Sequence, residues 1–132
     1  MNKAVGTFEV KINPLPPYNK SADAKLARMS IDKRFQGDLD ATSQGEMLSA
    51  GTDTKGSAGY VAIERVTGSL NDRSGSFALQ QNATLNRGAP YLNIVVIPDS
   101  GTGELAGLSG TMQIIIDKGK HSYEFEYGFS DA

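Results

Sequence analysis

Glu64 is the side chain in this sequence with the clearest capacity for chemistry. It lies in the largely apolar segment 61–66 and shares alternate positions with Tyr60. If that segment is a strand of a closed barrel, the carboxylate can point inward, where it requires a partner or becomes protonated. The more usual arrangement places Val61 and Ile63 in the core and leaves Glu64 in water. The direction of Glu64 matters because perturbed acids in cavities mark functional sites more often than chance.

Three other polar side chains continue apolar stripes at alternate positions. Gln81 follows Phe77 and Leu79, and we expect it to mark the mouth of the barrel, because amides are rarely fully buried. The alternative for Gln81 is a hydrogen bond inside the protein. Tyr123 and Tyr127 belong to an aromatic stripe near the C-terminus, and their phenol groups can donate hydrogen bonds inside a pocket.

His121 is the one histidine, a residue type that titrates near neutrality. It shares a face with Tyr123, but the neighbouring Lys118 and Lys120 favour a position on a solvent-facing rim over a catalytic one. A single histidine and no cysteine make a transition-metal site uncommon. We also expect the acidic residues near Asp38 to face water. The sequence therefore indicates no metal and no cofactor.

Residues 101–106 fit the loose dinucleotide-binding pattern G-x-G-x-x-[GA]. That pattern binds a pyrophosphate only when a helix follows, because the free N–H groups at the start of the helix hold the phosphates. Here Gly107, Gly110 and a segment of β-forming residues follow instead. We therefore interpret residues 101–106 as a structural loop rather than a nucleotide site.

Length and charge narrow the function classes further. The chain has 132 residues, with 13 basic and 15 acidic side chains and a formal net charge of −2. This length corresponds to one domain, residues 1–132, with a core large enough to fold without disulfides. The near-balanced charge argues against a nucleic-acid partner, which needs a basic surface. No signal peptide is apparent, and the longest apolar stretch, residues 94–97, is far shorter than the ~20 residues that span a bilayer. We expect a cytoplasmic protein without membrane contact.

Short segments with apolar residues at alternate positions, separated by glycine-rich turns, predict an all-β chain. The predicted strands are 4–12, 26–35, 45–49, 60–70, 76–85, 91–97, 110–117 and 120–129. Leu39 and Ala41 are expected to continue the second strand past a kink at Gly37. The nearly all-apolar segment 91–97 is predicted to be the most buried strand, and one short helical turn is expected between Ser21 and the second strand.

About eight strands with short connections fit either a sandwich or a closed barrel. The last predicted strand places on one face Tyr123, Phe125, Tyr127 and Phe129. That aromatic face must be covered, and a barrel interior covers it while closure removes exposed strand edges. We therefore predict a single antiparallel closed barrel with an interior wide enough for side chains or one small ligand.

Four segments carry a resemblance to a known family: residues 58–65, 68–80, 96–110 and 121–127. Over nearly the whole domain the chain resembles the bacterial domain-of-unknown-function family 3224. The resemblance implies a small closed antiparallel barrel like that of allene oxide cyclase, often found as a homodimer, and it implies no established activity. Members of that family commonly carry a histidine where this chain has Gln81, which weakens any acid–base chemistry inferred from the resemblance.

The leading hypothesis for function is the binding of a small, largely apolar molecule. The predicted ligand-binding residues are Tyr60, Glu64, Gln81, Tyr123 and Tyr127, because apolar pockets with a few polar groups are typical of ligand sites. One alternative, by analogy with allene oxide cyclase, is a cofactor-free isomerase or cyclase. Glu64 would then be the acid or base, and Tyr123 or Tyr127 would donate a hydrogen bond. A second alternative is a dimeric structural or accessory protein with a filled barrel.

Overall fold

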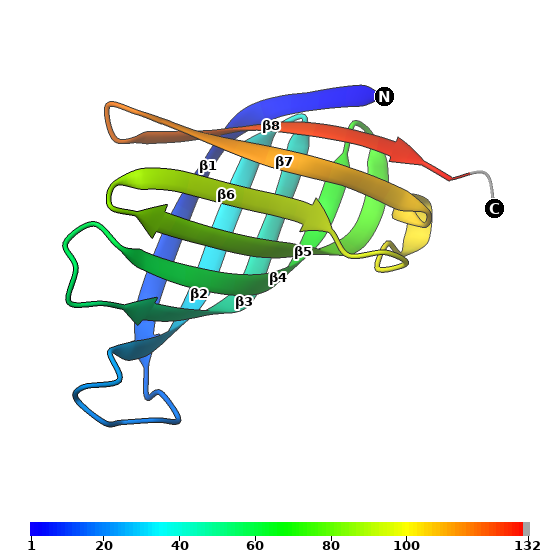
Figure 1. Ribbon diagram of the computed structural model, residues 1–132. Coiled ribbons are helices and arrows are strands. Elements are labelled where there is room, and N and C mark those ends of the chain that lie inside the picture. Colours follow the sequence, from blue (N-terminus) through cyan, green and yellow to red (C-terminus); the bar gives the residue numbers. More distant parts are fainter. Residues whose placement is uncertain (131–132) are drawn as a thin grey trace.

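The computed structural model, which describes residues 1–130, is a closed barrel of eight antiparallel strands in sequential order (Figure 1). The elements are β1 (Asn2–Leu15), β2 (Leu26–Gly37), β3 (Leu39–Gly51), β4 (Ala58–Leu70), β5 (Arg73–Asn86), β6 (Ala89–Val96), the 3-10 turn η1 (Gly103–Leu105), β7 (Leu108–Asp117) and β8 (Lys120–Phe129). Each strand pairs with the next, and β1 completes the ring by pairing with β8, where Ala4 lies opposite Phe125. The predicted all-β closed barrel is confirmed. Across residues 1–130, no helix has the length and apolar character to cross a membrane.

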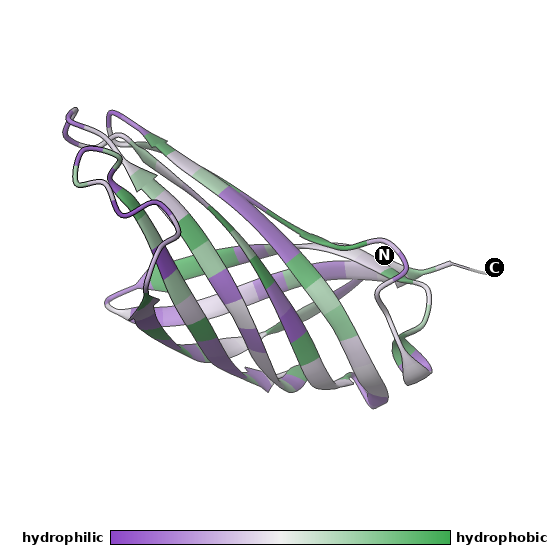
Figure 2. Ribbon diagram, turned by 90° about the horizontal axis from the view of Figure 1, so that it is seen from below, coloured by the Kyte–Doolittle hydropathy of each residue, from purple (hydrophilic) through white to green (hydrophobic). Residues whose placement is uncertain are grey.

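Side chains alternate between the barrel interior and its outer surface along each strand, as the pleat of a strand requires. On β8, Tyr123, Phe125 and Tyr127 are buried, whereas Glu124 and Glu126 point to the outer face. Figure 2 shows this alternation as bands of apolar and polar residues along the strands. The aromatic stripe predicted near the C-terminus therefore lines the interior.

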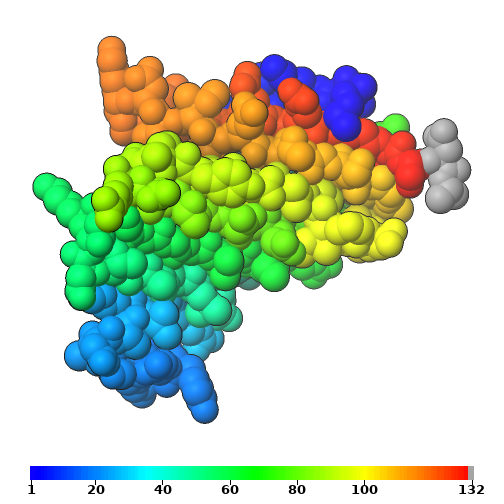
Figure 3. All heavy atoms as spheres, in the orientation of Figure 1, coloured from blue at the N-terminus to red at the C-terminus, as the bar shows by residue number. Residues whose placement is uncertain are grey.

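The two ends of the barrel differ. At the end that we call the closed end, toward the top and right of Figure 1, lie the tight turn between β2 and β3, the tight turn 71–72 and the loop 97–107. Figure 3 shows that loop packed against the barrel. Loop atoms bond to β5, since the Thr102 N–H donates to the Ser76 carbonyl at 2.8 Å, and Leu105 from η1 joins the buried core. The opposite, open end carries the connections 16–25, 52–57, 87–88 and 118–119.

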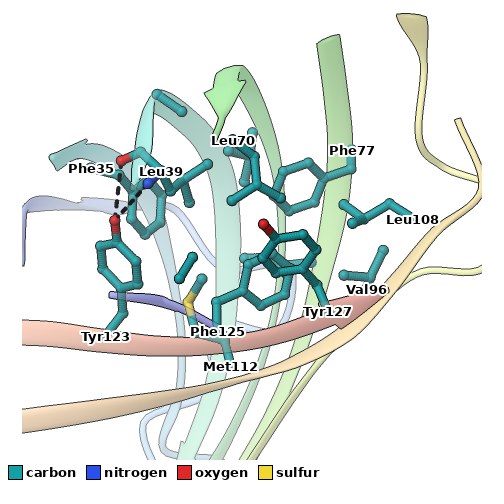
Figure 4. Close-up of a cluster of buried hydrophobic side chains, with 14 of the residues drawn as sticks. Phe35, Leu39, Leu70, Phe77, Val96, Leu108, Met112, Tyr123, Phe125 and Tyr127 are labelled. Atoms are coloured by element: carbon teal, nitrogen blue, oxygen red, sulfur yellow. Dashed lines mark hydrogen bonds between the residues drawn. The ribbon is translucent and has the colours of Figure 1, made fainter. Parts of the chain in front are cut away.

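The closed half of the interior is filled with apolar side chains (Figure 4). The Phe125 ring stacks between the rings of Phe77 and Tyr127, with centroid separations of 5.9 and 5.4 Å. The Tyr123 ring meets Phe35 edge-on at 5.7 Å. Aromatic pairs of this kind add to the free energy gained by removing the rings from water. This half of the barrel therefore holds the hydrophobic core.

Tyr123 also closes the turn between β2 and β3. Its hydroxyl oxygen accepts the N–H of Leu39 at 2.9 Å (Figure 4). It also lies 3.0 Å from the carbonyl oxygen of Gln36, to which it can donate. Gly6 on β1 makes room for this group, because a Cβ atom at that position would lie 2.5 Å from the Tyr123 hydroxyl. Tyr127 acts similarly at the next turn, where its hydroxyl accepts the side-chain amide of Asn71 at 2.7 Å.

Three expectations are wrong in and near β2 and β3. Gly37 does not kink a continuing strand, because it is the last residue of β2, where its φ of +110° leads into a tight turn, and Leu39 begins a new strand. That strand, β3, extends well beyond the predicted 45–49 because backbone pairing with β2 and β4 supports its polar half. Near Ser21 the chain forms a turn, closed by the Ala24 N–H on the Ser21 carbonyl, without a helix.

The prediction that 91–97 is the most buried strand is also wrong. Ile94 and Val96 of β6 are buried, but Tyr91 and Leu92 are exposed. The physical reason is position: β6 begins at the open end, and it is joined to β7 through the single residue pair Val95–Thr111. The first half of β6 is therefore paired through its backbone only with β5.

We expect Tyr123→Phe to lower the free energy of unfolding by about 1–3 kcal/mol, because the buried Leu39 N–H loses its acceptor. Urea denaturation followed by circular dichroism measures the loss. The exposed Tyr91 provides the control, since Tyr91→Phe removes a hydroxyl outside the core. Equal stability of the two variants would contradict the structural role of the Tyr123 hydroxyl.

Candidate functional site

One group of polar side chains lies inside the barrel, between the hydrophobic core and the open end. We call it the interior polar cluster, and its members are Lys33 on β2, Ser43 on β3, Tyr60 and Glu64 on β4, and Gln81 on β5. Each occupies an inward position of its strand, and the antiparallel register brings neighbouring strands to the same height. The cluster therefore follows from alternation and register together.

Glu64 is the centre of the cluster, with only 1% of its surface exposed. The Lys33 ammonium lies 3.0 Å from one carboxylate oxygen and 3.2 Å from the other. The Gln81 side-chain amide donates to the carboxylate at 3.0 Å, and the Ser43 hydroxyl donates at 3.3 Å. A buried carboxylate needs such partners, because an isolated charge in the interior costs several kcal/mol or more.

Lys33 has apolar neighbours in addition to the carboxylate. Its ammonium lies 5.2 Å from the centroid of the Phe8 ring and 5.7 Å from that of Phe35. Cation–π attraction to two rings offsets part of the hydration that the ammonium loses on burial. Throughout residues 1–130, no buried side-chain nitrogen or oxygen lacks a hydrogen-bond partner. The interior polar cluster is thus electrically neutral and fully paired.

Gly45 gives Glu64 its space. It lies directly opposite Glu64 on β3, and a Cβ atom built on it would lie 2.7 Å from the Cβ of Glu64 and 2.1 Å from the Ile63 carbonyl oxygen. Any larger residue would force β3 away from β4 or displace the carboxylate. The close approach of these two strands therefore depends on glycine at this position.

Tyr60 connects the cluster to the open end. Its hydroxyl donates to the side-chain oxygen of Gln81 at 3.1 Å, and Tyr60 is only half-buried. Burial, followed by the nearby negative charge of Glu64, raises the pKa of the Tyr60 phenol. The phenol therefore keeps its proton and remains a hydrogen-bond donor to Gln81.

Beyond Tyr60, most inward side chains are apolar and exposed to water, and the half-buried Ser49 and His121 are polar exceptions. Four large side chains at these positions are between 42% and 65% exposed, and we call them the mouth residues: Ile12, Leu85, Leu92 and Ile116. They come from β1, β5, β6 and β7, so they line one side of the open end. The open half of the barrel thus combines apolar walls with one polar cluster.

In the structure, the Glu64 side chain points into the barrel. Val61 and Ile63, which the usual arrangement would place in the core, point outward and are 52% and 55% exposed, so Glu64 points into the barrel. The expectation that Gln81 marks the mouth is wrong, since its side chain is buried. The reason is the Glu64 carboxylate, which takes a hydrogen bond from the Gln81 amide and so makes an internal position favourable.

The structure brings together three of the five residues predicted to bind a ligand. Tyr60, Glu64 and Gln81 belong to the interior polar cluster, whereas Tyr123 and Tyr127 lie in the closed half with their hydroxyls bonded at the turns. Sequence reasoning missed Lys33 and Ser43. A usable signal existed for Lys33, because it shares alternate positions with Ile31 and Phe35, both of which are buried.

The remaining candidates lie away from the cluster. His121 is half-buried at the start of β8, with its ring 5.2 Å from that of Phe8. Asp38 accepts the N–H of Val5 at 2.9 Å. In the part of the chain that the structure describes, no three histidine or acidic side chains are placed to hold a metal ion. Residues 101–106 form a loop with the short turn η1, as predicted, and strand β7 follows.

The chain is similar in sequence to one protein family and in structure to one of its solved members. A family model described as a protein of unknown function (DUF3224) matches residues 4–127. A crystal structure of a protein with unknown function from the DUF3224 family of Shewanella oneidensis MR-1 is 51% identical in sequence, with a TM-score of 0.96. The match covers 100% of this chain and 99% of that one. The comparison with curated proteins finds no match.

We expect Lys33→Met to destabilise the protein by about 3–5 kcal/mol, because it leaves the Glu64 carboxylate buried without its countercharge. Adding Glu64→Gln should restore part of the loss. Arg28→Met breaks the exposed Arg28–Glu46 pair and should have a much smaller effect, which makes it the matched control. Urea denaturation measures all three, and a similar loss for both lysine and arginine variants would count against a buried ion pair.

Tyr60 should ionise at higher pH than an ordinary tyrosine, because its pKa is raised by burial and by Glu64. The folded protein then holds the proton more tightly than the unfolded chain, so this contribution to stability is present below the ordinary tyrosine pKa and is lost as pH rises through the folded value. The difference between alkaline ultraviolet titrations of wild type and Tyr60→Phe isolates the Tyr60 signal. In a Glu64→Gln background that signal should move to lower pH, and no movement would remove Glu64 as a cause.

Proposed function

This chain belongs to the DUF3224 family of proteins of unknown function, and we propose that it binds a small, largely apolar molecule in the open half of its barrel. The closed half is filled by buried aromatic and aliphatic side chains, so it offers no space for a ligand. The proposed site therefore comprises the mouth residues and the interior polar cluster beneath them.

The half-buried Tyr60 is the observation that carries the proposal. Its hydroxyl belongs to a buried polar network, while its surroundings toward the open end are exposed apolar side chains. Ligand sites in proteins have this composition, with apolar walls and a few convergent polar groups. Covering the mouth residues would also gain roughly 25 cal/mol for each Å² of apolar surface removed from water.

The buried Lys33–Glu64 pair supports a functional interior over a purely structural one. Such a pair is weak support for stability, because desolvation of both charges offsets their attraction, and apolar residues of similar volume often stabilise a core equally well. A barrel with only a structural role would gain as much from filling this space with apolar side chains. A role in orienting a ligand therefore explains the pair better than a purely structural role does.

A cofactor-free isomerase or cyclase is the second candidate, and the inward direction of Glu64 favours it. In that case, Glu64 is the acid or base, and Tyr60, after releasing Gln81, donates a hydrogen bond to the substrate in place of Tyr123 or Tyr127, whose hydroxyls are bonded in the closed half. Glu64 would have to exchange its bond with Lys33 or Gln81 for one with the substrate. Binding is the more direct proposal because it requires no such exchange.

Binding through the open end predicts that Leu92→Glu weakens the affinity for octan-1-ol and octan-2-one by about tenfold or more, because a carboxylate resists burial against an apolar chain. Tyr91→Glu is the matched control, since Tyr91 immediately precedes Leu92 in β6 and points outward. Titrations followed by amide chemical shifts measure both affinities. The proposal fails if neither compound binds the wild-type protein, or if the two variants lose affinity equally.

A further inference from the structure

The hydrogen bonds of the interior polar cluster run in one direction. The Glu64 carboxylate can only accept hydrogen bonds, so Gln81 must turn its amide nitrogen toward it, and that nitrogen lies 3.0 Å from the carboxylate. The Gln81 carbonyl oxygen consequently points away from Glu64. A flipped amide would set this oxygen against the carboxylate, which is repulsive, so the orientation of Gln81 is determined by Glu64.

The direction continues to Tyr60. The Gln81 oxygen is an acceptor, and the Tyr60 hydroxyl supplies its single hydrogen to it at 3.1 Å. The raised pKa of Tyr60 keeps that hydrogen in place near neutral pH. Once the hydrogen is used, the phenol oxygen has only lone pairs left, so it can accept a hydrogen bond but cannot donate one.

Within the interior polar cluster, this acceptor belongs to the least buried residue. Tyr60 is the half-buried member of the cluster, whereas Lys33, Ser43, Glu64 and Gln81 are all buried behind it. The backbone beside Tyr60 is occupied, because β4 pairs on one side with Ser49 and on the other with Ala83. The open half therefore presents mainly apolar walls, the half-buried Ser49 and His121 and, at the inner limit of the walls, the hydrogen-bond acceptor of Tyr60.

From this polarity we infer that the ligand ends in a hydrogen-bond donor, an alcohol hydroxyl or an amine, on an otherwise apolar body. The inference rests on the proposed function and adds the chemical class of the ligand. A ketone, ether or carboxylate oxygen would face the Tyr60 oxygen lone pair to lone pair, and it would leave both groups without a hydrogen. An alcohol or amine would extend the series of hydrogen bonds that runs from Glu64 through Gln81 and Tyr60 to the ligand.

Four compounds of equal chain length test the inference: octan-1-ol, octylamine, octan-2-one and octanoic acid. Each is titrated into the labelled full-length protein, and the dissociation constant is taken from amide chemical shifts. We expect the alcohol and the amine to bind about tenfold more tightly than the ketone and the acid, which is the size of one unsatisfied polar group. Tyr60→Phe should remove this difference, whereas Tyr91→Phe, on the outer face, should preserve it.

A second variant should reduce or remove the preference for the alcohol. Gln81→Met removes the acceptor that holds the Tyr60 hydrogen, so the phenol becomes free to donate, and the ketone should gain affinity relative to the alcohol. A spectrum with dispersed amide signals shows that each variant is folded. If the wild-type protein binds the ketone or the acid as tightly as the alcohol, the donor rule is overturned while apolar binding stands. If none of the four binds, the proposed function falls with it.

Discussion

Closure of the sheet between β1 and β8 is the constraint on which the rest of the structure depends. The junction pairs residues from opposite ends of the chain, with Ala4 opposite Phe125, and it converts one face of every strand into an interior. Once the ring is closed, each inward side chain must either pack, find a polar partner or face the open end. The aromatic core, the interior polar cluster and the mouth residues are these three outcomes in order along the barrel.

The interior polar cluster is compatible with the core because it is neutral and complete. Lys33 and Glu64 cancel each other's charge, and Ser43 and Gln81 occupy further acceptor positions of the carboxylate. Because Gly45 has no Cβ, β3 can lie close to β4 beside Glu64. A stability argument alone does not explain a paired charge in a barrel, and this is why the cluster, rather than the aromatic stripe, directs attention to function.

The all-β class, most strands and the closed barrel could be predicted from sequence, because alternation on β8 left an aromatic face that only an interior could cover. The direction of Glu64 could not, since β4 carries apolar side chains on both faces, with Val61 and Ile63 outside. β3 was underestimated because its first half is polar and is held by pairing rather than by hydrophobic pattern. The interior polar cluster could not be predicted, because it depends on the register between neighbouring strands, and the residue pattern of one strand does not reveal that register.

The sequential order of the strands has a consequence for how the ring is assembled. Each strand contacts the one just before it in the chain, so hairpins can add one after another with little loop entropy to overcome. Among the strand pairings, only β1–β8 joins strands that are far apart in the chain. The start of β1 and the end of β8 lie side by side there. A circular permutant that joins them and is opened at the β7–β8 turn would keep the same strand neighbours. In it, β8 and β1 would be consecutive, and the β7–β8 pairing would be the one that joins the two ends of the chain.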